Sequence, residues 1–251
     1  MPDSAVHARV LQAARNNAVW CDMVCRTHGM PGEFHPSMWI NHFATPPFYP
    51  NAVTLAAGHD QDAQLGHIHD LIAARIPGAW AVKDSFSALD LASLGFTMLF
   101  EAMWIYRPAT AVRPTARSTD VRWERVSTAA ELHAWERAGR GTPAEPAAPA
   151  QAELFRPALL ADSNVLIAGA YHQHRIVAGA IANRTGAVVG LSNVFAPEQG
   201  TATFWAGCVG MILDRFPGQA LVGYETGEGL AHAEACGFAA LQPLRVWEII
   251  T

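Results

Sequence analysis

The chain has 251 residues, of which 51% are hydrophobic and 16% are charged, and its formal net charge at pH 7 is −5. This composition excludes a disordered chain, because it supplies ample apolar material for a core. The negative net charge argues against nucleic acid as a partner, because nucleic-acid binding requires a basic surface.

The first half of the sequence is predicted to alternate between helices and strands. An alanine-rich helix is expected over residues 4–26, and residues 29–51, which Gly and Pro interrupt, are expected to form loops with short strands. Apolar residues at helical spacing predict a helix over residues 62–76. The other predicted elements are strands at 52–58, 79–85 and 96–106 and a short helix at 87–94.

The second half opens with a predicted strand at 120–126, after which Ser127 or Thr128 is expected to cap a helix, with Glu131 at capping-box spacing from Thr128. Two strand-like runs follow, around a tight turn near His172–His174. Segment 107–120 is interpreted as the domain boundary and the Pro/Ala-rich segment 139–151 as a mobile loop. The remaining predicted elements are a strand, a helix, a strand, a helix and final strands, at 187–196, 201–216, 219–225, 228–236 and beyond Gly237.

Two stop signals occur twice and in the same order. Pro77-Gly78 and Pro217-Gly218 each follow a predicted helix, and Gly95-Phe96 and Gly237-Phe238 each follow the next one. We therefore predict a duplicated unit of strand, helix, strand, helix and strand. The alternative is that these pairs are common stop signals that recur independently in an α/β chain.

The second half also resembles the GNAT superfamily of acyl-CoA-dependent N-acetyltransferases. The resemblance rests on the order of the elements and on the stretches "LSNVFAPEQGTA", "ALVGYE" and "GLAHAEACGF". The two-unit arrangement is similar to tandem GNAT proteins, in which one half commonly keeps the chemistry. It implies an α/β (α+β) fold of two GNAT-like units, each a mixed, mostly antiparallel sheet flanked by helices. A degenerate unit is expected at residues 1–112 and the acyltransferase domain at 113–251.

The resemblance implies an acetyl-CoA site at the start of the helix predicted after Gly200. A helix N-terminus with unpaired N–H groups suits the pyrophosphate, and a glycine lets the backbone approach an anion. The loop keeps the Gly and Ala of the family pattern, whereas Pro197 stands where the family has Gln or Arg, so a plain turn at Gly200 is the alternative. The strand before the loop is expected to pair with the pantetheine arm. The implied acetyl-CoA-binding residues are Asn193, Val194, Phe195, Gln199, Gly200, Thr201, Ala202, Thr203 and Thr226.

Acetyl transfer to an amine requires a base for the amine, a polarised thioester carbonyl and an acid for the leaving thiolate. The tyrosine that serves as this acid in many family members corresponds to Ala233. Its nearest substitutes are Tyr224 and His232. Glu225, or a histidine of the "YHQH" turn, is the candidate base, directly or through water. Structural roles for all of these residues are the alternative.

The first half lacks the anion-binding pattern. Asp60, Asp62 and Asp70, in and around its predicted helix, would repel a pyrophosphate. We therefore interpret this half as a structural partner that lends a wall to the acceptor site. The aromatic stretch 43–51 would line that wall or pack as a surface loop.

The four cysteines are few for this length and are interpreted as free thiols in a reducing, cytoplasmic setting. We expect no signal peptide in residues 1–20, and no apolar run suggests a membrane span. No metal is expected, because His67 and His69 are two apart in a predicted helix and do not share a face.

Two functions fit these observations. The first is an N-acetyltransferase that uses acetyl-CoA as cosubstrate and acetylates a small amine-bearing acceptor. The second is a catalytically degenerate GNAT-like protein that binds CoA, another ligand or a protein partner. The turn at Gly200 and Ala202 favours the first, whereas Pro197 and Ala233 favour the second. Neither function involves nucleic acid or a membrane. The sequence leaves open whether the protein forms a homodimer.

Overall fold

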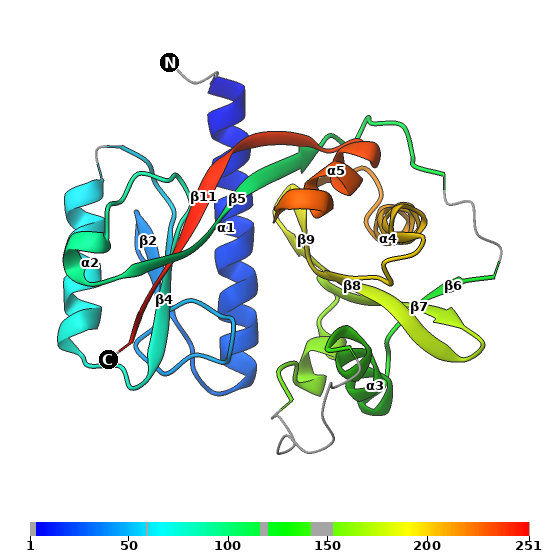
Figure 1. The fold of residues 1–251 in the computed structure, drawn as a ribbon, viewed down its shortest axis with the longest axis horizontal. Helices are drawn as coiled ribbons and strands as arrows, with labels where there is room; N and C mark the ends of the chain where they lie inside the picture. The colour runs from blue at the N-terminus through cyan, green and yellow to red at the C-terminus, as the bar shows by residue number, and fades with distance from the viewer. Residues whose placement is uncertain (1–3, 59, 116–119, 142–152, 251) are drawn as a thin grey trace. The chain divides into compact units, whose positions relative to one another are not determined.

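The structure is a computed structural model that describes residues 4–58, 60–115, 120–141 and 153–250 (Figure 1). Most of the loop expected at 139–151 lies outside the described residues. The chain forms two compact units. Unit 1 comprises Met1–Ile105, Tyr224–Thr226 and Ala240–Thr251, and unit 2 comprises Tyr106–Gly223 and Gly227–Ala239.

Unit 1 is a mixed sheet with two helices. Its strands follow the order β1-β2-β3-β4-β11-β5. β3 and β4 are parallel, whereas β1–β2, β2–β3 and β4–β11 are antiparallel. The elements are α1 (Ser4–Thr27), β1 (Glu33–Phe34), β2 (Met38–Ile40), β3 (Ala52–Thr54), α2 (Gln61–Ala73), β4 (Ala79–Asp84), the 3₁₀ turn η1 (Ala92–Leu94), β5 (Thr97–Arg107) and β11 (Ala239–Ile250).

The two helices of unit 1 cover opposite faces of its sheet. Met38 and Ile40 of β2 pack in one apolar cluster with Ile68 of α2. Between them, Trp39 donates a hydrogen bond of 3.2 Å from Nε1 to the carboxylate of Asp22 in α1. Because successive side chains of a strand point to opposite faces, α1 and α2 must lie on different sides of β2.

The last strand of the chain belongs to unit 1. β11 pairs with β4 from Arg245↔Asp84 to Ile250↔Ala79 and lies between β4 and β5 in the strand order. We expected this strand to complete the domain at 113–251. It groups instead with unit 1, because its backbone hydrogen bonds go to β4. The bounds of the two duplicated halves along the sequence stay a prediction.

Unit 2 has helices on both faces of its part of the sheet (Figure 1). Its strand order is β10-β9-β8-β7-β6, with β9 and β10 parallel and the other pairs antiparallel. α3 lies on one face of this sheet, and α4 and α5 lie on the other (Figure 1). The elements are β6 (Arg122–Arg125), α3 (Ala129–Gly139), the 3₁₀ turn η2 (Pro157–Ala161), β7 (Val165–His172), β8 (Arg175–Thr185), β9 (Val188–Phe195), α4 (Thr201–Arg215), β10 (Ala220–Glu225) and α5 (Gly227–Ala235).

Two local predictions for this unit are confirmed. The hydroxyl of Thr128 accepts the N–H of Glu131 at 3.2 Å, and the Glu131 carboxylate accepts the N–H of Thr128 at 3.0 Å, which completes the capping box. The β7–β8 hairpin turns tightly at Gln173 and His174, which have φ of 47° and 65°. Positive φ at both central residues is the signature of a two-residue hairpin turn of type I′.

The repeated Gly-Phe signal has the same structure in both units. Gly95 and Gly237 are left-handed, with φ of 88° and 87°. In each case the N–H of the following phenylalanine donates to a carbonyl of the preceding turn, that of Leu91 at 3.2 Å and that of Ala233 at 3.1 Å. This is the glycine cap that ends many helices. Each cap precedes the last strand of its half, which supports duplication.

The short helix expected at 87–94 is only the turn η1. The carboxylate of Asp84 accepts the N–H of Leu89 at 2.8 Å and that of Phe86 at 3.3 Å. Such side-chain bonds to the local backbone compete with helix formation. They explain why the helix does not begin at residue 87.

The segment expected as a linker, 107–120, is partly packed into unit 2. Arg107 is fully buried. Its guanidinium donates to the carbonyl oxygens of Cys236, Ala111 and Val112 at 2.9, 3.2 and 2.9 Å. The boundary between the two units falls at the start of this segment, between Ile105 and Tyr106. The burial of Arg107 was not readable from composition, because an arginine that is satisfied by backbone carbonyls looks like a solvated residue.

All four cysteines are buried free thiols. Burial raises the pKa of Cys21 to about 11 and that of Cys25 to about 12. In the part of the chain that the structure describes, no helix has the length and hydropathy of a membrane span, and no three His, Cys, Asp or Glu side chains are grouped as metal ligands.

We predict that Gly179 of β8 tolerates no side chain. A Cβ atom there would lie 2.2 Å from Nε1 of Trp135 and 2.6 Å from the ring of Phe195. Gly179→Ala should therefore lower the free energy of unfolding by about 1–3 kcal/mol, the usual cost of overpacking, in a urea titration. The control is Gly66→Ala in α2, where a Cβ meets nothing within 4 Å. It should be neutral or stabilise by up to about 1 kcal/mol, because alanine favours helix. Equal effects of the two substitutions would contradict the prediction.

Candidate functional site

β9 carries a β-bulge at the residues expected to bind the pantetheine arm. Its pairing with β8 shifts between Gly179 and Ile181. Asn193 takes the left-handed conformation there, with φ of 52°. A bulge leaves its extra residue out of the ladder and bends the strand. The backbone around Asn193 and Val194 therefore has polar groups that the β8–β9 ladder does not use.

Phe195 fixes the end of β9 through its side chain. Its ring packs edge-on against Trp135 of α3, with centroids 5.0 Å apart and an interplanar angle of 72°. Trp135 is itself held by a hydrogen bond of 2.8 Å from Nε1 to the carbonyl of Ala168 in β7. Since the Phe195 side chain packs against α3, only its backbone is available to a ligand.

The parallel ladder between β9 and β10 ends early. Its last assigned pair is Val222↔Gly190, whereas β9 continues to Phe195 and β10 to Glu225. Backbone polar groups beyond the last pair need other partners. The resemblance implied a thioester slot at this place.

α4 begins directly after the loop expected to hold the pyrophosphate. Gly200 is its N-cap, left-handed with φ of 83°, and has no capping side chain. The Thr201 hydroxyl donates to the carbonyls of Pro197 and Glu198, at 2.8 and 3.0 Å. The N–H of Thr203 donates to the carbonyl of Gly200 at 2.9 Å. An anion would therefore be bound by the N–H groups before it, at Thr201 and Ala202, where the helix dipole also favours negative charge. Gln199, Gly200 and Ala202 are exposed, and Thr201 and Thr203 are half-buried.

Tyr224 is half-buried and held from two sides within unit 1. Its ring packs edge-on against Trp104, with centroids 5.7 Å apart and an interplanar angle of 89°. Its hydroxyl oxygen accepts a hydrogen bond of 3.3 Å from Nζ of Lys83. We had not singled out Lys83 in the sequence. The available signal was a lysine among the apolar residues of a predicted buried strand.

Glu225 has a carboxyl group that suits a general base. Burial raises its pKa to about 7, and a hydrogen bond from the backbone of Thr226 opposes that rise. A carboxyl group with this pKa can take up and release a proton near neutral pH. Consecutive residues of a strand point to opposite faces, so the structure does not bring Glu225 and Tyr224 together on one face.

The other expected acid and base residues lie on different elements. His232 is half-buried on α5, in unit 2. The neighbouring Ala233, where many family members have tyrosine, is fully buried, so this position faces the packed interior. His172 and His174 are exposed at the β7–β8 turn.

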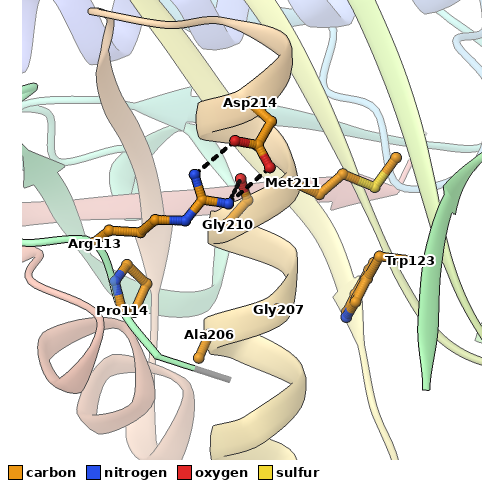
Figure 2. A pocket seen from close by; sticks show the side chains of 8 residues that line it. All are labelled: Arg113, Pro114, Trp123, Ala206, Gly207, Gly210, Met211 and Asp214. Atoms are coloured by element: carbon orange, nitrogen blue, oxygen red, sulfur yellow. Dashed lines mark hydrogen bonds and ion pairs between the residues drawn. The ribbon is translucent and has the colours of Figure 1, made fainter. Parts of the chain in front are cut away.

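Unit 2 also contains a cavity of about 290 Å³ along α4 (Figure 2). At one side, Arg113 donates to both carboxylate oxygens of Asp214, at 2.6 and 2.7 Å, and to the carbonyl of Gly210 at 3.1 Å. Trp123 lies across the helix from it (Figure 2). None of the residues expected to bind acetyl-CoA lines this cavity. Because the charge of Arg113 is already paired, the cavity does not replace the anion site at α4.

No family model and no curated protein sequence matches the chain. Solved structures do resemble it. A GCN5-related N-acetyltransferase from Kribbella flavida superposes with a TM-score of 0.62 at 15% identity, covering 94% of this chain and 95% of that one.

Two further structures cover the chain as completely. A tandem GNAT protein from the clavulanic acid biosynthesis pathway has a TM-score of 0.54 at 13% identity and covers 94% of this chain and 95% of its own. A GNAT-family protein from Novosphingobium aromaticivorans has a TM-score of 0.53 at 12% identity, with 94% and 97% covered. The chain therefore has the GNAT fold of these structures.

Proposed function

We propose that the protein is an N-acetyltransferase that transfers acetyl from acetyl-CoA to the amine of a small acceptor. The observation that carries the proposal is the early end of the β9–β10 ladder, next to the bulge at Asn193 and before the open N-terminus of α4. An acyl-CoA requires this combination. Strand backbone outside the ladder suits the amide-rich pantetheine arm, and free N–H groups suit the pyrophosphate.

In this proposal, different elements of unit 2 bind different parts of acetyl-CoA. The backbone of β9 at the bulge would pair with the arm, and the first turn of α4 would receive the pyrophosphate. Glu198 is an exposed acid in the same loop and weakens the site for an anion. The proposed contacts in unit 2 are Asn193, Val194 and Phe195 for the arm and Gln199, Gly200, Thr201, Ala202 and Thr203 for the pyrophosphate.

The proposed chemistry uses the two faces of β10. Glu225 accepts a proton from the acceptor amine through water, which frees the nitrogen to bond to the thioester carbon. Tyr224 gives its hydroxyl proton to the sulfur as the carbon–sulfur bond breaks, so the thiol leaves neutral. His232 is the substitute for Tyr224.

One observation favours the second function, a GNAT-like protein that binds CoA or another ligand without turnover. Ala233 is fully buried at the position of the family's tyrosine acid. Such a protein would bind CoA, another ligand or a protein partner and would acetylate no amine.

The binding site at α4 predicts the effect of Gly200→Val. A valine side chain would block the approach of an anion to the first turn of the helix. The dissociation constant for acetyl-CoA should rise by about tenfold or more, measured by calorimetry. Gly218→Val is the control, because Gly218 also has a positive φ, 74°, with nothing within 4 Å of its Cβ. Equal affinities of the two variants would remove this site from consideration.

The proposed acid predicts the effect of Tyr224→Phe. The variant keeps the ring that packs on Trp104 and loses only the hydroxyl. It should lower kcat by about 10²-fold, the usual scale of general-acid effects, with acetyl-CoA affinity nearly unchanged. Steady-state kinetics with an amine acceptor test this, with Tyr171→Phe as the control. Unchanged turnover would exclude Tyr224 and direct the test to His232.

The raised pKa of Glu225 predicts a pH-dependent gain of stability in Glu225→Gln. With a pKa of about 7, the charged carboxylate is the disfavoured form in the folded protein. Wild type therefore loses stability as the pH rises from about 5 to 8, whereas the glutamine variant does not. The melting temperatures should converge at low pH and separate at high pH. Glu228→Gln, at an exposed acid of α5, should show no such trend. A pH-independent difference would contradict burial as the cause.

A further inference from the structure

Lys83 is a buried cation that the chemistry described above does not yet use. It lies on β4, and only 4% of its surface is exposed. Burying an ammonium group costs free energy unless strong partners replace the lost water. A methionine would fill a similar volume without that cost. Packing alone therefore does not explain a charged residue at this position.

The contacts of Lys83 in the described part of the chain are with neutral groups. Nζ donates to Oδ1 of Asn17 in α1 at 2.9 Å and to the Tyr224 hydroxyl at 3.3 Å. Nζ also lies 4.3 Å from the centroid of the Tyr224 ring. Burial raises the pKa of the nearby Cys21, and the charge of Lys83 opposes that rise, so Cys21 is a thiol rather than a counter-ion.

The direction of the Lys83–Tyr224 hydrogen bond follows from chemistry. An ammonium group has three donors and no acceptor, so the hydroxyl oxygen must be the acceptor. The hydroxyl proton of Tyr224 is then free to be donated elsewhere. Trp104 limits the movement of the ring, since it packs edge-on and is itself bonded through Nε1 to the carbonyl of Ser85 at 2.8 Å.

We propose that Lys83 is a positioning residue. It would orient the Tyr224 hydroxyl as the proton donor to the leaving thiolate and stabilise the phenolate that remains. The inference rests on the proposed acetyltransferase function. When the carbon–sulfur bond breaks, the sulfur takes the electron pair and then the hydroxyl proton, which leaves a phenolate beside the Lys83 ammonium. The cation stabilises this phenolate through space until a proton from solvent restores the hydroxyl.

Turnover tests the proposal with a double-mutant cycle. Lys83→Met should lower kcat by about tenfold or more and leave KM for acetyl-CoA within about twofold, whereas Lys83→Arg, which keeps the charge, should retain most of the activity. In the Tyr224→Phe background, Lys83→Met should cost nothing further, because its target is gone. Additive losses would overturn the proposal, because Lys83 would then act independently of Tyr224.

A spectroscopic readout tests the same contact without any acceptor. The near-ultraviolet absorbance of Tyr224 at neutral pH, taken as the difference between each protein and its Tyr224→Phe counterpart, should differ between Lys83→Met and wild type, because the ammonium group lies 4.3 Å from the centroid of the ring. Thermal unfolding checks that the variants are folded. Coincident absorbance curves would overturn the proposal.

The outcomes separate this inference from the proposed function. If Tyr224→Phe loses turnover and Lys83→Met does not, only the role of Lys83 is wrong. If Tyr224→Phe retains wild-type turnover, the assigned acid is wrong and the role of Lys83 falls with it. If no amine is acetylated, the absorbance curves decide whether the charge of Lys83 acts on Tyr224.

Discussion

The antiparallel pairing of β11 with β4 is the constraint on which unit 1 depends. β4 lies between β3 and β11, and Lys83 is opposite Val53 on one side and Val246 on the other. Trp247 of β11 also belongs to the apolar cluster that α2 covers. β11 thus completes the sheet of unit 1, whose other strands lie more than 130 residues earlier in the sequence. Unit 1 cannot reach its final hydrogen bonding until β11 is made, although most of its sequence is made first.

Two neighbouring titratable residues of β10 have different surroundings, because their side chains point to opposite faces of the strand. Tyr224 faces a buried ammonium group, which donates a hydrogen bond to its hydroxyl oxygen. Glu225 points to the other face, where burial disfavours its charged form and favours uptake of a proton. The alternation of the strand is enough to separate the two environments.

Local features were readable from the sequence, and long-range pairing was not. The capping box at Thr128, the turn at His174 and the repeated glycine caps each depend on residues close together in the chain, and all three were predicted correctly. The overall GNAT-like order was also predicted. By contrast, the place of β11 depends on backbone bonds to β4, far away in sequence, for which Gly, Pro and apolar spacing carry no information.

The same distinction between local and long-range features applies to the candidate site. The start of α4 after Gly200 follows from a local glycine signal and was anticipated. The bulge at Asn193 has no sequence signature, because asparagine in an otherwise regular strand does not reveal a change of register with β8. The contact between Lys83 and Tyr224 joins positions that only the folded sheet and its packing bring together.

The burial of the four thiols has a consequence for the proposed acetyl transfer. A thiolate would attack the carbonyl of acetyl-CoA and take the acetyl group by exchange, in competition with the amine. Here burial holds the pKa of Cys21 near 11 and that of Cys25 near 12, and it also raises the pKa values of Cys208 and Cys236. The raised pKa values therefore disfavour the thiolate form of all four cysteines, which is the form that would attack a thioester. Thiol reagents should for the same reason react slowly with the folded protein. Any CoA that the proposed reaction releases could then be measured by the reaction of its thiol with such a reagent, with little background from the cysteines.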